Sequence, residues 1–355
     1  MRQTLARKIL QRHTEETVTA DGQIVRCRVS LVLANDITAP LAIKSLHEMG
    51  AVRVFDPERV ALVCDHFTPN KDIDSAEQVR LVREFAREMD IVHYYEGGDS
   101  GVEHAILPEY GLVGPGDIIV GADSHTCTYG GLGAFATGLG STDIAAAMAL
   151  GETWFRVPET IRVNFTGRLP EYVGGKDLIL LTIGEIGVAG ALYRALEFGG
   201  EAVDALDVEG RMTMANMAIE AGAKAGLFSA DIKTLDYCRS HGRTGDTLLA
   251  ADEGAAYVRE LAFDVNGLPP LVACPHLPDN VRPVDEVSGV RVDQVVIGSC
   301  TNGRIGDLRE AARVIRGRKV AKGVRLIVIP ASPGAYSQAM DEGFLRIFLD
   351  AGAII

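Results

Sequence analysis

Short runs rich in β-branched residues alternate with helical segments along this chain, and this alternation limits its fold more than any other feature. Strands joined by helices form mainly parallel sheets with the helices on their faces. The predicted strands lie at 59–66, 117–126, 157–167 and 324–332 and at the start of 292–304. The predicted helices lie at 74–90, capped by Asp74 or Ser75, at 141–155, capped near Ser141, and at 307–317. The chain is therefore predicted to be an α/β protein.

Polar residues stand at the ends of three of these predicted strands. They are Asp65-His66, Asp123-Ser124-His125 and the stretch 299–302. In open α/β sheets, ligands bind beyond the carboxyl ends of the strands. The pattern alone therefore predicts that these residues gather at a binding or catalytic site.

The length of 355 residues predicts two or three domains, because single hydrophobic cores stop growing below this size. A strand that enters a new unit at 157–167 and a linker rich in Pro, Asp and Asn at 277–289 suggest the boundaries. The predicted domains are 1–165, 166–286 and 287–355.

Charge and composition exclude several classes of protein. The formal net charge of -13 argues against nucleic-acid binding, and no run of about 18 apolar residues predicts a membrane span. The basic residues before Glu15 could belong to a transit peptide, but Leu5, Ile9 and Leu10 favour an amphipathic first helix. The six cysteines form no CxxC pair and no disulfide framework, which predicts a cytoplasmic protein with mostly buried thiols.

The strand-end histidines are candidates for proton transfer. A carboxylate such as Asp65 beside an imidazole such as His66 can raise its pKa and keep it protonated, as a general acid requires. The alternative is an aspartate that caps a turn beside an exposed histidine. Asp123-Ser124-His125 adds a second histidine near an acid, but its spacing does not supply the geometry of a hydrolase triad. His104, taken by itself, is more typical of a loop histidine.

Cys300 is the most distinctive thiol. It lies in a strand-to-helix turn, GSCTNGR, where a nearby helix N-terminus favours the thiolate. It is a candidate nucleophile or soft-metal ligand, and the alternative is an inert buried cysteine. Asn216 and Glu220 share one face of a predicted helix, which a surface helix also allows. The glycine-rich segment 130–141 lacks the spacing and the lysine of a phosphate loop, so nucleotide binding is not predicted.

Together the motifs DH, DSHT, NMAIEAGAK and GSCTN, in this order and at these distances, resemble the aconitase superfamily. The resemblance runs from QTLARKIL through NDITAPLAIK, DHFTPNKDI and DIIVGADSHTCTYGG to IGSCTNGR and thus covers nearly the whole chain. It is strongest to the branch of 3-isopropylmalate dehydratase and homoaconitase large subunits. It implies an aconitase-like fold of three α/β/α domains with mainly parallel sheets, in which the third domain is expected to be incomplete.

The resemblance also implies chemistry. The family holds a [4Fe–4S] cluster on three cysteines, and the open iron acts as a Lewis acid on a small hydroxy-acid substrate. The expected reaction removes water from 2-isopropylmalate and re-adds it to give 3-isopropylmalate, in leucine biosynthesis. Homocitrate, another 2-alkylmalate or a tricarboxylate is the alternative substrate.

Residue by residue, the resemblance implies that His66, supported by Asp65, protonates the departing hydroxyl. The other expected catalytic pairs are His104 with Asp123 and His125 with Glu220. The expected substrate contacts are Asn35, Asp36, Thr38 and Ser124. Cys300 is the expected cluster and metal ligand, and Asn216 and Asn302 are expected beside the cluster.

Two parts of the family pattern are expected elsewhere. The other two cluster cysteines are expected beyond Ile355, so this chain is expected to be inactive alone. A base and a substrate-selecting loop are expected on a separate small subunit that carries the swivelling domain. Two other classes stay open: a cluster-free RNA-binding regulator, which the negative charge disfavours, and a mononuclear metalloenzyme built on the three histidines, whose spacing matches no short zinc signature.

Overall fold

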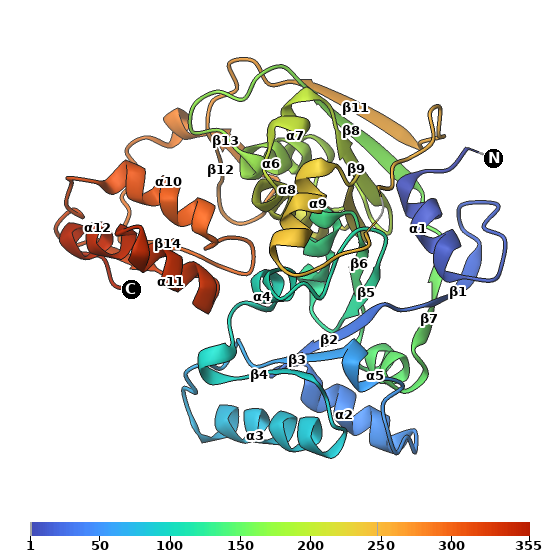
Figure 1. Cartoon of the computed structure of the whole chain (residues 1–355). Coiled ribbons are helices and arrows are strands. Elements are labelled where there is room, and N and C mark those ends of the chain that lie inside the picture. Colours follow the sequence, from blue (N-terminus) through green and yellow to red (C-terminus); the bar gives the residue numbers. More distant parts are fainter. Residues whose placement is uncertain (1, 247) are drawn as a thin grey trace.

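Three parallel sheets form the frame of the computed structural model, which describes residues 2–246 and 248–355 (Figure 1). The first sheet has the strand order β4-β3-β2-β5-β6, and all neighbours are parallel. Its strands are β2 (Leu31–Asn35), β3 (Val60–Val63), β4 (His93–Tyr95), β5 (Ile118–Gly121) and β6 (Phe135–Gly138). The chain adds β3 and β4 on one side of β2 and then adds β5 and β6 on the other. The order therefore reverses between β2 and β5, where sheets of this kind leave a binding crevice.

Both faces of this sheet are covered, which explains why β2 reads as an unbroken apolar run. Val32 and Ala34 enter the core beneath the sheet, whereas Leu31 and Leu33 enter the core above it. The helices of the lower face are α2 (Ala39–Glu48), α3 (Ile73–Glu88) and α5 (Ser141–Leu150). Those of the upper face are α4 (Glu103–Glu109) and the 3-10 helix η3 (Ser124–Leu132).

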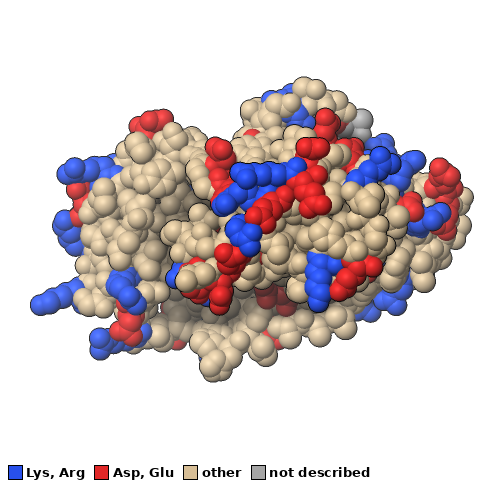
Figure 2. Space-filling model, turned by 90° about the horizontal axis from the view of Figure 1, so that it is seen from below, with Lys and Arg blue, Asp and Glu red and all other residues tan. Residues whose placement is uncertain are grey.

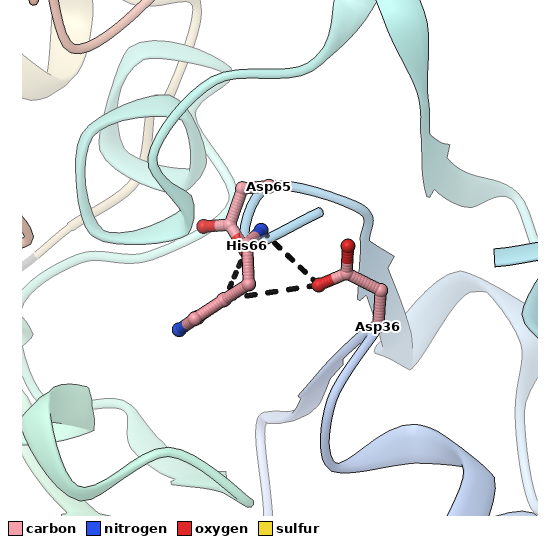
Figure 3. Close-up of side chains that lie close together, drawn as sticks. All are labelled: Asp36, Asp65 and His66. Atoms are coloured by element: carbon pink, nitrogen blue, oxygen red, sulfur yellow. Dashed lines mark hydrogen bonds and ion pairs between the residues drawn. The ribbon is translucent and has the colours of Figure 1, made fainter. Parts of the chain in front are cut away.

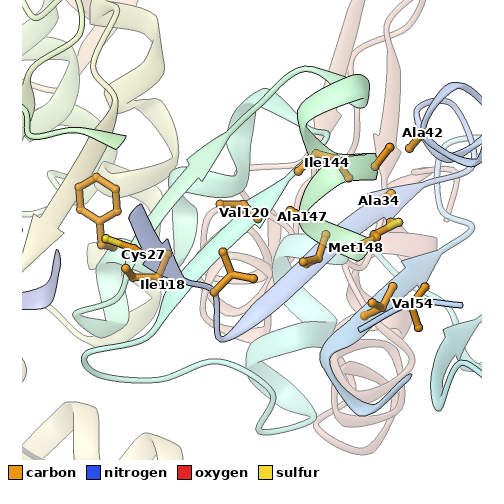
Figure 4. Packing of buried hydrophobic residues seen from close by; sticks show 14 of the residues in the cluster. Cys27, Ala34, Ala42, Val54, Ile118, Val120, Ile144, Ala147 and Met148 are labelled. Carbon is orange, nitrogen blue, oxygen red and sulfur yellow. The ribbon is translucent and has the colours of Figure 1, made fainter. Parts of the chain in front are cut away.

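Small residues let the lower helices lie close to the strands. Figure 4 shows Ala42 of α2 and Ala147 of α5 beside Ala34, with Ile144 and Met148 filling the space around them. Each of these side chains is at most 4% exposed. Burial of this kind contributes roughly 25 cal/mol per Å² of apolar surface, so the lower core is a main source of stability.

The remaining elements of the first part complete its edges. They are α1 (Leu5–His13), η1 (Pro57–Arg59), η2 (Gly97–Asp99) and the antiparallel pair β1 (Ile24–Arg28) and β7 (Glu152–Arg156). Leu5, Ile9 and Leu10 are fully buried, as the predicted amphipathic first helix requires.

The second sheet has the order β10-β9-β8-β11 and is also parallel throughout. Its strands are β8 (Thr160–Thr166), β9 (Ala195–Gly199), β10 (Ala225–Phe228) and β11 (Arg259–Asp264). The accompanying helices are α6 (Gly175–Ile186), α7 (Glu201–Ala205), α8 (Val208–Asn216), η4 (Met217–Ala221) and α9 (Ile232–Ser240). The predicted domain boundary at 165 falls inside β8, so the sheets themselves divide before Thr160.

Two glycines explain how closely the first two parts approach each other. A Cβ atom at Gly130 would lie 1.7 Å from the carbonyl oxygen of Gly226 in β10. A Cβ atom at Gly131 would lie 2.5 Å from the amide nitrogen of Met212 in α8. The glycine-rich segment is therefore a backbone-to-backbone seam.

The third part follows a small antiparallel hairpin. Strands β12 (Leu271–Ala273) and β13 (Val281–Pro283) and the 3-10 helix η5 (Val284–Val287) occupy much of the predicted linker. The parallel pair β14 (Gln294–Ile297) and β15 (Arg325–Val328) then follows with α10 (Ile305–Ile315), α11 (Pro333–Asp341) and α12 (Phe344–Ala351). Figure 1 shows these helices gathered at one end of the molecule.

Two local predictions were wrong. The helix predicted for 141–155 begins at Ser141 with its cap at the adjacent Gly140, but it ends at Leu150 because Gly151 adopts a left-handed conformation (φ 71°), and β7 follows. Helix α3 is capped by Asp72, whose carboxylate accepts the N–H of Ser75 while Ser75 bonds back. Ser75 is thus the third helical residue, in a capping box, and not the cap.

Charges of both signs are mixed on the surface. Figure 2 views the molecule from the α3 side and shows basic and acidic side chains next to one another. On α3, Arg80 pairs with Glu77 and Glu84. The helices that the structure describes are all too short or too polar to cross a bilayer.

Candidate active site

Three strand ends of the first sheet bring the predicted polar residues to one edge. Asn35 is the last residue of β2, and Asp65 and His66 follow the end of β3. Asp123 caps η3 just after β5 by accepting the N–H of His125 at 2.7 Å. Because these strands are parallel and adjacent, their carboxyl ends place all of these residues at the point where the strand order reverses.

His66 lies between two carboxylates (Figure 3). Its Nδ1 is 2.7 Å from Asp65 Oδ1 and 3.7 Å from Asp36 Oδ1. Asp36 also accepts the backbone N–H groups of His66 and Phe67, which holds the loop in place. The hydrogen bond with Asp65 raises the pKa of His66 above its usual value, although burial opposes the rise. Figure 3 shows the other ring nitrogen turned away from both acids, and the side chain is 37% exposed.

His104 is buried and uses both ring nitrogens. Its Nε2 lies 2.9 Å from Asp123 Oδ1, and its Nδ1 lies 3.2 Å from the hydroxyl of Tyr129. Burial alone would raise the pKa of Asp123, but hydrogen bonds with His104 and His125 hold that pKa well below its ordinary range. At 2.9 Å the two atoms are within hydrogen-bond distance.

His125 joins the first part of the chain to the second. Its Nε2 lies 3.3 Å from Glu220 Oε1 in η4, and its Nδ1 lies 3.2 Å from Ser124 Oγ. Asp123 and Glu220 together raise the pKa of His125 to about 10. The rings of His125 and His104 are 6.4 Å apart, so two of the three histidine–acid pairs are neighbours.

Glu103 is a candidate that the sequence analysis missed. Its Oε1 accepts the side-chain N–H of Asn35 at 3.1 Å, whereas its buried Oε2 has no partner in the described part of the chain. Burial, followed by the charges of Asp65 and Asp123, raises the pKa of Glu103 well above its ordinary value. The surroundings of Glu103 therefore favour its protonated form. Its position directly before His104 was the available signal.

The predicted substrate contacts lie in two different environments. Asn35 is fully buried, and its side-chain oxygen accepts the N–H and hydroxyl of Thr38. Asn35, Asp36 and Thr38 thus hold the turn beneath His66, and direct substrate contact by them stays a prediction. Ser124, in contrast, lines a cavity beside His125.

Asn216 ties Cys300 to the other two parts of the chain. Its amide donates to Thr128 Oγ1 at 2.8 Å and to the Cys300 carbonyl at 3.4 Å. It also accepts the hydroxyl of Thr301 at 2.7 Å. Residues of three sheets therefore meet at one fully buried amide, and the half-buried Cys300 thiol lies beside it.

The rest of the Cys300 turn is held from both sides. Asn302 donates to Thr213 Oγ1 at 3.2 Å and to Asp307 Oδ1 at 3.0 Å. Arg304, also missed from the sequence, is 3% exposed and donates to the carbonyls of Thr301 and His104. Its guanidinium thus links the cysteine turn directly to the His104 helix.

The thiols separate into two classes that bear on an iron–sulfur cluster. Burial raises the pKa of Cys127 to about 12, and its thiol donates to the Asn216 carbonyl at 3.2 Å. Burial likewise raises the pKa values of Cys27, Cys64 and Cys238. Cluster ligands are thiolates, so these four fit poorly. Cys300, half-buried in a polar turn next to His125, fits one ligand of a cluster.

Comparisons with known proteins agree with this geometry. The model of the aconitase family (aconitate hydratase) matches residues 7–289 and 282–355. The 3-isopropylmalate dehydratase large subunit of Nitratidesulfovibrio vulgaris strain Hildenborough is 74% identical over all of this chain, which covers 85% of that protein. The proteins of the same name from Oleidesulfovibrio alaskensis and Pyrococcus abyssi are 68% and 57% identical, with 85% and 84% of their lengths covered.

A solved structure supports the fold. Aconitase X of Thermococcus kodakaraensis matches 93% of this chain and 78% of its own with a TM-score of 0.54, at 16% identity. The predicted aconitase-like α/β fold with mainly parallel sheets is confirmed. Because the family model matches nearly the whole chain and these relatives cover all of it, this chain belongs to the aconitase family.

Proposed function

We propose that this chain is the large subunit of a 3-isopropylmalate dehydratase, an iron–sulfur hydro-lyase that interconverts 2-isopropylmalate and 3-isopropylmalate in leucine biosynthesis. One observation carries the proposal: three histidine–acid pairs and a half-buried thiol converge where the three parts meet, in a chain 74% identical to a protein of that name. The compartment we propose is the cytoplasm.

His66 is the proposed acid for the departing hydroxyl. Its Nδ1 is bonded to Asp65, so the proton available for transfer is at Nε2, on the open side of the ring. The hydrogen bond with Asp65 raises the pKa of His66 and so favours the protonated ring that a general acid needs. Asp36 keeps the loop, and with it the ring, in one orientation.

The other two pairs are proposed to order the opposite side of the site. His125, with its pKa near 10, is a cation at neutral pH and attracts the carboxylates of the substrate. The His104 side chain is buried and forms a hydrogen bond with the carboxylate of Asp123. The same carboxylate accepts the backbone N–H of His125 and so fixes the position of that residue. Ser124, beside His125, is the proposed hydroxyl contact for the substrate.

Cys300 is the proposed cluster ligand of this chain, with Asn216 and Asn302 beside it. When bound, a [4Fe–4S] cluster supplies a Lewis acid that polarises the substrate hydroxyl and a carboxylate. The described residues supply one of the three thiolates of the family pattern. We also propose a small-subunit partner that brings the base and the loop for the substrate's alkyl group; homocitrate or another 2-alkylmalate is the alternative substrate.

The test is turnover by the complete enzyme. The full-length chain, reconstituted anaerobically with iron and sulfide and mixed with the small subunit of the same organism, is offered 2-isopropylmalate, homocitrate or citrate. We expect 3-isopropylmalate, detected by NMR, and at least tenfold higher kcat/KM for 2-isopropylmalate. Preferred conversion of homocitrate or citrate would replace the substrate assignment, and no conversion of any of the three would contradict the proposed function.

A further inference from the structure

Lys224 lies next to the candidate site without an ion pair of its own. It precedes β10, and its Nζ donates to the carbonyl of Gly138 at 3.1 Å, at the end of β6. The Tyr193 ring is 5.6 Å from the ammonium, and Asp143 acts on it only at longer range. In the described part of the chain no carboxylate lies within ion-pair distance of this lysine.

The backbone that Lys224 contacts also supports Ser124. Gly138 is packed so closely that a Cβ atom there would lie 2.7 Å from the Asp123 carbonyl and 3.0 Å from the Ser124 Cα. Gly138 therefore lies between Lys224 and the segment that carries Ser124 and His125. Its position relative to Ser124 is set by backbone contacts and not by a flexible loop.

A cavity of about 490 Å³ connects the two residues. Ser124 and Lys224 both line it, together with the carboxylate of Asp143 and the apolar side chains of Leu139, Leu192 and Ile219. The cavity is linked to the proposed catalytic pair by Ser124, because its Oγ is 3.2 Å from His125 Nδ1. It is large enough for a small dicarboxylate.

The charge around the site makes this lysine distinctive. Asp36, Asp65, Asp123 and Glu220 surround the histidines, whereas the buried Arg304 is committed to two carbonyl groups. A substrate with two carboxylates needs cations that are free to bind it. The half-buried ammonium of Lys224 has Asp143 as a charged neighbour but no carboxylate at ion-pair distance among the described residues, so a bound anion would stabilise its charge.

We propose that Lys224 and Ser124 form a subsite that binds one carboxylate of a small dicarboxylate substrate. This inference rests on the proposed function and adds a substrate-binding residue to it. Burial lowers the pKa of Lys224, with Asp143 opposing the effect. Glu220 and the Arg156 that stacks on Tyr193 are the other charged groups nearby. The ammonium is therefore expected to lose its proton, and the subsite its affinity, at a lower pH than an exposed lysine would.

The test compares Lys224→Met, Lys224→Arg and the control Lys44→Met, an exposed lysine of α2, in the complete cluster-loaded enzyme with its small subunit. We expect Lys224→Met to raise KM for 2-isopropylmalate about tenfold or more while kcat changes less than about threefold, because a charge-assisted hydrogen bond is lost. Lys44→Met should match the wild type. Lys224→Arg should keep KM within about threefold and extend tight binding to higher pH.

Several results would overturn the subsite. One is a KM for Lys224→Met within twofold of the wild type. Another is an unchanged pH profile of KM in Lys224→Arg. A third is that Lys224→Met binds the small subunit more weakly but shows a normal KM once that subunit is saturating. This result would mean that Lys224 binds a carboxylate of the small subunit and not of the substrate. If the wild type turns over none of the substrates, the proposed function fails. Calorimetric titration of succinate into the wild type and into Lys224→Met then tests the subsite by itself, and equal affinity for the two proteins would overturn it.

Discussion

The histidine region at the end of the first sheet and the cysteine turn of the third part are held in different ways. Strands β2, β3 and β5 are buried along their whole lengths, and each site histidine has its acid partner within 3.3 Å. Strand β14 is mostly exposed. The side-chain amide of Asn216 donates to the backbone carbonyl of Cys300, and the Cys300 side chain stays half-buried. The three histidine–acid pairs are thus complete within this chain, whereas the half-buried Cys300 thiol has no carboxylate or imidazole hydrogen-bond partner among the described residues.

The difference between these two regions predicts that a substitution in the Cys300 turn has the largest effect. In the full-length chain, Cys300→Ser is expected to reduce bound iron and sulfide to background and to abolish turnover, because a serine is a poor ligand for the cluster. Iron and sulfide per protein are the measurements. Cys274→Ser, at another half-buried thiol, is the matched control and should bind the cluster normally. An intact cluster in Cys300→Ser would remove the ligand assignment.

A second prediction tests the histidine region. His66→Ala is expected to lower kcat by about a thousandfold or more, within the usual range for loss of a general acid, while cluster content and melting temperature stay close to wild type. Steady-state kinetics and thermal unfolding are the measurements, with the exposed His47→Ala on α2 as the control. Activity within a factor of ten of wild type would show that His66 is not the acid.

The smallest effect is expected at Glu103 and appears as a pH-dependent stability. The raised pKa means that the folded chain keeps a proton that the unfolded chain releases, so the contribution of Glu103 is full below the unfolded pKa and is lost as pH rises toward the folded one. Glu103→Gln, which is neutral at every pH, should therefore be about as stable as wild type at pH 4, below the unfolded pKa, and more stable at pH 8, by about 1 kcal/mol or more. Chemical denaturation at both values measures this, and an equal difference at both would mean that Glu103 is ionised.

Much of the fold was predictable because strand and helix periods are local properties. The strand ends at Asp65 and Asp123 were found in this way, and their meeting followed from parallel topology alone. The end of α5 was missed because one residue, Gly151, decides it. The cap of α3 was misplaced by two or three residues for a similar reason, since Asp72, Asp74 and Ser75 are all good capping types and only the backbone selects among them.

The local sequence pattern indicated the site residues, whereas the pairs His104–Asp123 and His125–Glu220 were expected only from the family resemblance. The pairing of His125 with Glu220 spans 95 positions, and no local pattern indicates it. Glu103 and Arg304 matter because they are buried, and burial of a charged residue is the least expected outcome for its type. Lys224 lay in a quoted motif, yet its cavity exists only once β6 and β10 are folded against each other.

The glycine seam also limits how this enzyme can open. At Gly130 and Gly131 the first two parts touch through their main chains, with no side chain between them that could change rotamer and absorb a displacement. Separating them would also pull Glu220 from His125. The main-chain contact therefore leaves little room for the first two parts to slide or tilt relative to each other without losing the His125–Glu220 pair.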